Sequence, residues 1–259
     1  MPEQRVFLPL LQHEYMWRHE RQHYREGRNK WWFVYAILLT LLWLPLWTYL
    51  INTGSVKLHN VWYFTLGFPY MAFFISYGNV IREWKNGTRD WWLALPHSRL
   101  HLVAAKYVAS LLQALLVTVV SFAVASILGA YTAVTSDVVD ADTLIRFLLT
   151  GASWSVILIA LYPLLIALGM FIGIVGRSRV KPLTPLLWIL FFLAASGLYT
   201  YFGSADDTHN LFLLFSGAES VTASFPYPPG LPFVVTASWL AAYCLVRATA
   251  RVLERHLDI

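Results

Sequence analysis

Six long apolar stretches run along the chain, and shorter segments that carry most of the charge separate them. The stretches are residues 31–51, 61–81, 102–128, 147–175, 183–202 and 231–252. A helix of about 20 apolar residues, rising about 1.5 Å per residue, crosses the roughly 30 Å hydrocarbon core of a bilayer. The pattern therefore predicts an all-α integral membrane protein with six transmembrane helices.

The composition of the 259-residue chain agrees with this fold class. Hydrophobic residues make up 58% of the sequence and charged residues 13%, which is too apolar for an ordinary soluble domain. No tandem repeat or low-complexity linker divides the stretches, so we expect one domain over residues 31–259, preceded by a charged tail over residues 1–30. The single cysteine, Cys244, lies in the last stretch, so we expect no intramolecular disulfide.

Basic residues set the expected orientation, because Lys and Arg beside transmembrane helices are retained on the cytoplasmic side. Of the 19 Lys and Arg residues, only Lys57 and Arg146 lie in the first and third connections; the others gather at the tail, the second and fourth connections and the C-terminal end. Acidic residues mark the third and fifth connections: Asp137, Asp140, Asp142, Asp206, Asp207 and Glu219. Both termini are therefore predicted to be cytoplasmic, and the net charge of +5 follows from this bias and from anionic lipids, without nucleic acid.

The N-terminal tail, residues 1–30, is predicted to form an interfacial helix. Leu10, Trp17 and Tyr24 recur every seven residues and so share one side of a helix, although Arg21 falls near that stripe. Tryptophan favours the headgroup layer of a membrane. The alternative is a solvated basic tail.

The same tail contains a literal H-E-x-x-H string, formed by His19, Glu20 and His23. On a helix this spacing places two imidazoles one turn apart, where they bind zinc in metalloproteases, with the glutamate as base. Arg21 lies inside the string, and the sequence identifies no third ligand nearby. A charged helix that faces lipid headgroups is therefore the preferred interpretation, and a metal site is the weaker alternative.

Two further segments have informative patterns. Residues 203–230 form the longest outer connection, yet residues 211–215 read LFLLF and are too apolar for a freely solvated loop, so we expect a partly re-entrant or surface-lying piece. In the fourth stretch Gly169 and Gly173 form a GxxxG string, which allows close helix approach, either within the chain or in a dimer. Ser110 and Gln113 in the third stretch are expected to face other helices or a water-filled path, because unpaired polar groups are costly in hydrocarbon.

The second connection combines charged residues with tryptophans and is the candidate working part of the chain. Gly87 is suited to a turn, Thr88 to capping a following helix, and Pro96 to ending that helix before the chain re-enters the membrane. The segment therefore predicts a short cytoplasmic helix of about two turns. Its charged face would meet a soluble protein while its tryptophans stay in the membrane interface.

Within and just after this connection, Glu83, the Gly87–Thr88 pair, the run from Leu93 to Arg99, and Lys106 resemble the signature of ABC type-2 (ABC-2) permeases. Those permeases typically show an acidic residue, a Gly-Thr pair, a leucine-rich turn ending in Pro-x-Ser-Arg, and a lysine that opens the third span. Six spans with cytoplasmic ends agree with the same family. His97 and the doubled tryptophan at residues 91 and 92 are individual to this sequence.

The resemblance implies that the second connection holds a coupling helix seated on a separate ATPase. The implied ATPase-coupling residues are Arg82, Glu83, Asn86, Gly87, Thr88, Arg89, Asp90, Trp91, Trp92, Pro96 and Arg99, with Lys106 as anchor of the next helix. Glu83 is the leading candidate for transmission, and the alternative is a solvated surface glutamate. A carboxylate at a membrane boundary is costly unless it is paired, and Arg82, Arg89, Lys106 or a cation of the ATPase are the candidate partners.

The chain itself lacks the phosphate-binding loop of an ATPase, because residues 173–181 read GIVGRSRVK and do not match G-x-x-x-x-G-K-[ST]. The resemblance therefore implies no cofactor on this chain, with ATP and Mg²⁺ on the separate ATPase. It also implies an assembly of two permease protomers, identical or different, with two ATPase subunits in a bacterial cell membrane. The expected activity is export of a hydrophobic or amphipathic compound such as a peptide antibiotic, drug or lipid. The alternatives are a membrane metalloprotease and an ATP-independent channel or scaffold.

Overall fold

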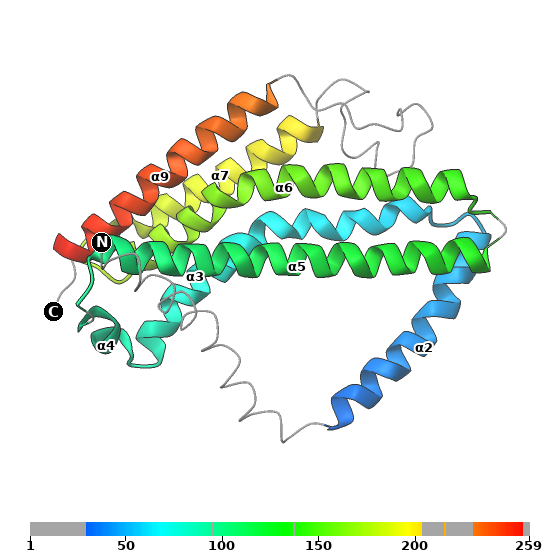
Figure 1. Cartoon of the computed structure of the whole chain (residues 1–259), viewed down its shortest axis with the longest axis horizontal. Coiled ribbons are helices and arrows are strands. Elements are labelled where there is room, and N and C mark those ends of the chain that lie inside the picture. The colour runs from blue at the N-terminus through cyan, green and yellow to red at the C-terminus, as the bar shows by residue number, and fades with distance from the viewer. Residues whose placement is uncertain (1–29, 95, 137, 204–214, 216–229, 256–259) are drawn as a thin grey trace, which may run out of the picture.

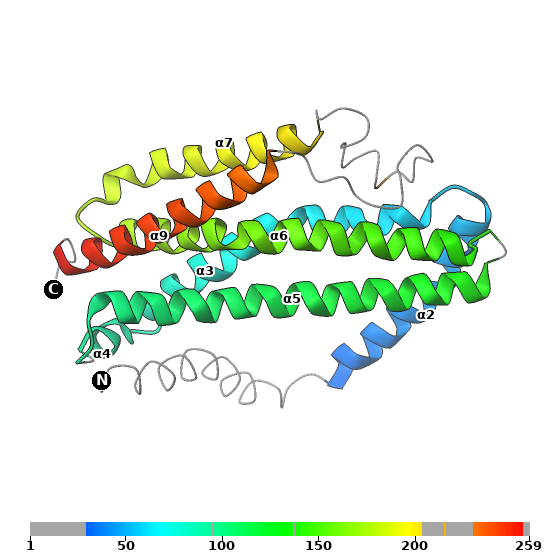
Figure 2. The ribbon, with the colours of Figure 1, turned by 45° about the horizontal axis from the view of Figure 1, so that its top comes forward.

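The computed structural model describes residues 30–94, 96–136, 138–203, 215 and 230–255, and all elements within these ranges are helical. They are α2 (Lys30–Asn52), η2 (Leu58–Gly67), α3 (Phe68–Lys85), α4 (Arg89–Ala94), α5 (Arg99–Thr135), α6 (Ala141–Val175), η3 (Lys181–Leu183), α7 (Thr184–Gly203) and α9 (Leu231–Arg255). Helices α3, α5, α6 and α9 pack together as a bundle, α7 lies on its flank, and α2 diverges from it (Figure 1). A turned view shows the same arrangement (Figure 2).

The prediction of an all-α membrane protein is confirmed. Five helical segments among the described residues are long and apolar enough to cross a bilayer: Phe33–Asn52, Leu58–Lys85, Arg99–Thr135, Ala141–Val175 and Leu231–Arg255. The sixth predicted span coincides with α7, whose apolar segment Lys181–Gly197 is shorter than these five. The count of six spans and the cytoplasmic termini stay predictions.

Two helices extend well beyond their predicted boundaries. α5 and α6 contain 37 and 35 residues, which is more than 50 Å at about 1.5 Å per residue. The predicted span 102–128 lies inside α5, which continues to Thr135, and the predicted span 147–175 ends where α6 ends. Hydropathy reports only the most apolar part of a helix, so it does not mark where the helix begins. The helices begin instead at polar caps: the Ser98 side chain accepts the N–H of His101, and Asp140 accepts the N–H of Thr143.

The second apolar stretch is not one continuous α-helix. The 3₁₀ helix η2 leads into α3, and Pro69 lies in the first turn of α3, where its missing N–H costs no intrahelical bond. Buried indoles fix η2 against α6: Trp62 Nε1 donates to the Phe147 carbonyl at 2.9 Å, and Trp154 Nε1 donates to Thr65 Oγ1 at 2.8 Å. This end of the bundle is therefore well packed.

The GxxxG string packs within the chain. A Cβ added at Gly169 would lie 2.4 Å from the Phe73 carbonyl oxygen of α3, and one at Gly173 would lie 3.1 Å from Val80 Cγ1. Ser76 donates to the Ile166 carbonyl at 2.6 Å across the same contact. Of the two predicted uses of the glycines, the structure shows close packing of α6 against α3.

Helix α2 joins the bundle through its C-terminal part. Trp47 Nε1 donates to Thr132 Oγ1 at 3.1 Å, and Ser136 donates to Asn52 Oδ1 at 2.6 Å. The rest of α2 leans away from α5 in both views (Figures 1 and 2), and its apolar side chains are exposed, as expected for a surface that meets lipid.

Some predictions concern residues outside the described ranges. All but the last residue of the predicted interfacial helix, residues 1–30, falls there. The string of His19, Glu20 and His23 and almost all of the segment 203–230 do so as well. Phe215 is the described residue within the apolar run of that segment. Its ring is buried and makes edge contacts with Tyr63 and Trp154, so this position of the run is not solvated.

Candidate functional site

The turn between α3 and α4 has a backbone geometry that depends on glycine at position 87. The N–H of Gly87 bonds to the Trp84 carbonyl at 3.4 Å, and the N–H of Thr88 bonds to the Glu83 carbonyl at 3.1 Å. These two bonds are those of a Schellman motif, which requires a left-handed residue after the helix end. Gly87 supplies it with φ of +67°, so the predicted turn at Gly87 is confirmed.

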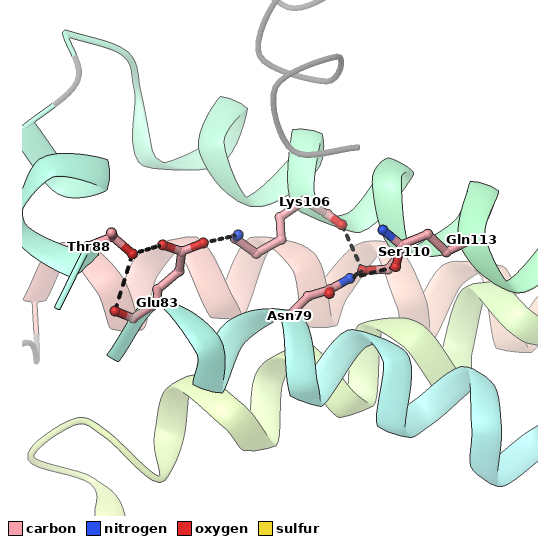
Figure 3. Close-up of polar contacts among 6 residues, drawn as sticks. All are labelled: Asn79, Glu83, Thr88, Lys106, Ser110 and Gln113. Atoms are coloured by element: carbon pink, nitrogen blue, oxygen red, sulfur yellow. Dashed lines mark hydrogen bonds and ion pairs between the residues drawn. The ribbon is translucent and has the colours of Figure 1, made fainter. Parts of the chain in front are cut away.

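Glu83 and Lys106 form a buried ion pair between α3 and α5 (Figure 3). Lys106 Nζ lies 3.0 Å from Glu83 Oε1, and the two residues are 2% and 5% exposed. The Thr88 hydroxyl donates to Glu83 Oε2 at 2.6 Å. Among the candidate partners of Glu83, the structure therefore selects Lys106, and the alternative of a solvated surface glutamate is wrong. The Thr88 hydroxyl, which was predicted to cap α4, forms this short hydrogen bond with Glu83 instead.

Helix α4 is seated on the end of the bundle by two buried side chains. Trp92 and Leu93 belong to an apolar cluster with residues of α3, α5, α6 and α9, including Leu102, Met170 and Leu253. The Lys106 ammonium lies 5.2 Å from the centre of the Trp92 ring, within cation–π range. The prediction that Trp92 lies in the membrane interface is therefore wrong, because the ring packs inside the protein against a charged group.

The connection from α4 to α5 is closed by two polar contacts. Arg99 Nη1 donates to the Leu93 carbonyl at 2.5 Å, which satisfies a carbonyl at the end of α4. Ser98 caps α5, and its Oγ also lies 2.5 Å from His101 Nδ1. Both ends of α4 are thus tied to the ends of its neighbours, so a displacement of α4 pulls on α3 and α5.

A chain of amides and hydroxyls continues from the ion pair into the bundle (Figure 3). Ser110 donates to the Lys106 carbonyl at 2.9 Å, and Asn79 Nδ2 donates to Ser110 Oγ at 3.0 Å and to Gln113 Oε1 at 3.1 Å. The prediction that Ser110 and Gln113 face another helix is confirmed. The sequence analysis did not identify Asn79. Its amide lies four residues before Glu83 and therefore on the same face of the helix, which is the signal that could have identified it.

The implied coupling residues divide by burial. Glu83 and Trp92 are buried, and Thr88 and Arg99 are partly buried. Arg82, Asn86, Gly87 and Pro96 are exposed. Arg89, Asp90 and Trp91 lie in α4, but their side chains are outside the described part of the structure. The segment therefore has an exposed rim suited to a partner and a buried interior that contacts α3 and α5.

Comparison with known proteins identifies the class of protein that this fold and segment define. A family model described as ABC-2 family transporter protein matches residues 12–212. The chain therefore belongs to the ABC-2 transporter family, which confirms the resemblance, and it is a multi-pass membrane protein. Searches of curated proteins and of solved structures found no match.

Proposed function

We propose that the chain is the transmembrane permease subunit of an ATP-driven exporter, and that α4 receives the motion of a separate ATPase. In this proposal two such chains, or this chain and a second permease, assemble with two ATPase subunits that bind ATP and Mg²⁺. The chain crosses the bacterial cell membrane six times with both termini in the cytoplasm. The cargo is a hydrophobic or amphipathic compound, since the spans offer apolar and aromatic surface.

The observation that carries this proposal is the buried Glu83–Lys106 pair. A buried ion pair contributes little net stability, because desolvation of the two charges offsets their attraction. Well-packed apolar residues of similar volume often serve stability as well or better. We therefore attribute to the pair a specific geometry rather than stability: it fixes the α3–α4 turn to α5 in one arrangement.

The coupling step is a rigid-body movement. The ATPase contacts the exposed rim formed by Arg82, Asn86 and Pro96 and displaces α4 when ATP binding closes it. Thr88 and Glu83 carry the displacement to α3, and Lys106 carries it to α5. The long, continuous helix α5 then transmits the movement to the opposite end of the bundle.

The test uses the assembled complex, purified from its native membrane by mild cross-linking, and asks whether an ATPase with a phosphate-binding loop accompanies the chain. Glu83→Gln is expected to reduce substrate-stimulated ATP hydrolysis and transport, both measured per assembled complex, because the loss of one charge of a buried pair also lowers stability. Glu254→Gln is the control, since Glu254 is an exposed carboxylate near the end of α9, whose Leu253 shares the apolar cluster of α4. Absence of any ATPase, or unchanged coupling in Glu83→Gln, would overturn the proposal.

A further inference from the structure

A cleft of about 820 Å³ lies between α3, α6, η3 and α7, and neither Glu83 nor Lys106 lines it. It is located where α6 ends and α7 begins, at Gly176 to Thr184. Its volume falls in the range of sites that hold small organic molecules. Its position at the ends of two apolar helices is where the boundary between hydrocarbon and headgroups is expected.

One wall of the cleft is apolar and aromatic. Tyr77 and Ile81 come from α3, Ile172 from α6 and Trp188 from α7. The rings of Tyr77 and Trp188 meet edge to face, with centres 5.6 Å apart, so their positions are fixed by packing. This wall matches a hydrocarbon chain, and tyrosine and tryptophan are the residues that proteins place at the level of lipid headgroups.

The lining of the cleft also includes cationic and polar groups. Arg177 and Lys181 line it with exposed side chains. Thr184 also lines it, and among the described residues its hydroxyl oxygen is buried without a hydrogen-bond partner. A Cβ at position 176 would lie 3.7 Å from that oxygen, so Gly176 keeps the space beside it open. A buried hydroxyl without a hydrogen-bond partner is unfavourable, and a ligand that accepts a hydrogen bond from it removes this cost.

We propose that this cleft binds an anionic phospholipid of the surrounding membrane. The phosphate lies between Arg177 and Lys181 and accepts a hydrogen bond from Thr184, while an acyl chain follows Ile81 and Trp188. Basic pockets between transmembrane helices on the cytoplasmic side are recognised binding sites for anionic headgroups. This inference does not depend on the ATPase, and its test measures binding alone.

The experiment uses the purified full chain in a neutral detergent and measures bound lipid by native mass spectrometry. Phosphatidylglycerol is expected to bind more tightly than phosphatidylcholine of the same acyl chains. Arg177→Gln with Lys181→Gln should weaken phosphatidylglycerol binding about 10- to 30-fold, as expected for two cations near a membrane surface. Thr184→Val should weaken it about 2- to 10-fold through loss of one hydrogen bond.

Two controls keep the result specific. Arg251→Gln with Arg255→Gln removes the same charge from exposed positions of α9 and should leave binding unchanged. Arg177→Lys with Lys181→Arg keeps the charge and should retain binding, and every variant is checked for monodispersity and helix content. Equal binding of the two lipids, an equal loss in the α9 control, or full competition by inorganic phosphate would overturn a lipid site.

Discussion

Lys106 Nζ lies between the Glu83 carboxylate, at 3.0 Å, and the Trp92 ring, whose centre is 5.2 Å away. One ammonium group therefore links α5 both to the end of α3 and to α4. The pair could act on stability, on transmission or on both. A single substitution does not distinguish these roles, because removing one charge destabilises the fold whatever the functional role of the pair.

A pair of variants distinguishes these roles. Lys106→Met alone is expected to lower the free energy of unfolding by about 3–5 kcal/mol, since it leaves Glu83 buried without its cation. Adding Glu83→Leu should recover most of that stability but not substrate-stimulated ATP hydrolysis. Denaturation in detergent and ATPase assays of the assembled complex measure the two effects. Arg251→Met, which changes an exposed cation of α9, is the control and should alter neither. Recovery of both properties in the double variant would contradict a transmission role.

The close approach of α6 to α3 predicts a strong effect at Gly169. Gly169→Ala would place a Cβ 2.4 Å from the Phe73 carbonyl, and backbone does not rotate away as a side chain does, so the helices must separate. We expect a loss of about 1–3 kcal/mol in thermal or denaturant unfolding. Gly197→Ala is the matched control: it lies in α7 with open space around it, and alanine there should be neutral or stabilising by about 0.5–1 kcal/mol. Equal effects at the two sites would contradict the packing.

The left-handed turn at Gly87 predicts a graded response. Gly87→Ala should destabilise the protein by about 1–2 kcal/mol, because a Cβ is disfavoured at φ of +67°. Gly87→Asn should cost less, since asparagine tolerates this conformation better. A Cβ at position 87 meets no atom within 4 Å, so crowding does not explain any loss. Unfolding midpoints of the two variants measure the difference, and a larger loss for asparagine than for alanine would refute the turn geometry.

Local signals in the sequence predicted part of the coupling segment. A Gly-Thr pair after a charged helix end indicates a turn, and the cost of an unpaired carboxylate in a membrane predicts a cation beside Glu83. Which of several cations pairs with Glu83 could not be predicted from the sequence, since the pairing with Lys106 depends on the register of α3 against α5. That register is set by contacts among helices, including the bonds of Asn79 to Ser110 and Gln113.

Other features could not be predicted because they depend on contacts distant in sequence. Trp92 was expected in the membrane interface, as tryptophan usually is, but the cluster that buries it contains Leu102, Met170 and Leu253 from three other helices. The span boundaries were displaced for a different reason. Hydropathy measures affinity for lipid, whereas α5 and α6 begin at the caps Ser98 and Asp140.

The cap at Asp140 predicts a pH dependence of stability. Hydrogen bonds from the Thr143 side chain and backbone hold the pKa of the Asp140 carboxyl below its ordinary value of 3.8. A carboxyl with a lowered pKa in the folded state stabilises the fold above its unfolded pKa, and the contribution is lost as the pH falls through the folded pKa. The contribution of Asp140 should therefore be constant near neutral pH and decline below about pH 4.

The measurement compares unfolding midpoints of the wild type and Asp140→Ala between pH 7 and pH 3. The wild type should be more stable at pH 7, because alanine lacks the cap that accepts the Thr143 N–H at 2.8 Å. That advantage should begin to shrink below about pH 4, because protonation of the carboxyl weakens the charge-assisted bond. Asp142→Ala is the control in the same connection. Asp142 pairs with Arg146 at 2.7 Å on an exposed surface, where an ion pair contributes little, so its removal should have a smaller effect at every pH. A wild-type advantage that persists unchanged at pH 3 would show that the cap does not act through its charge.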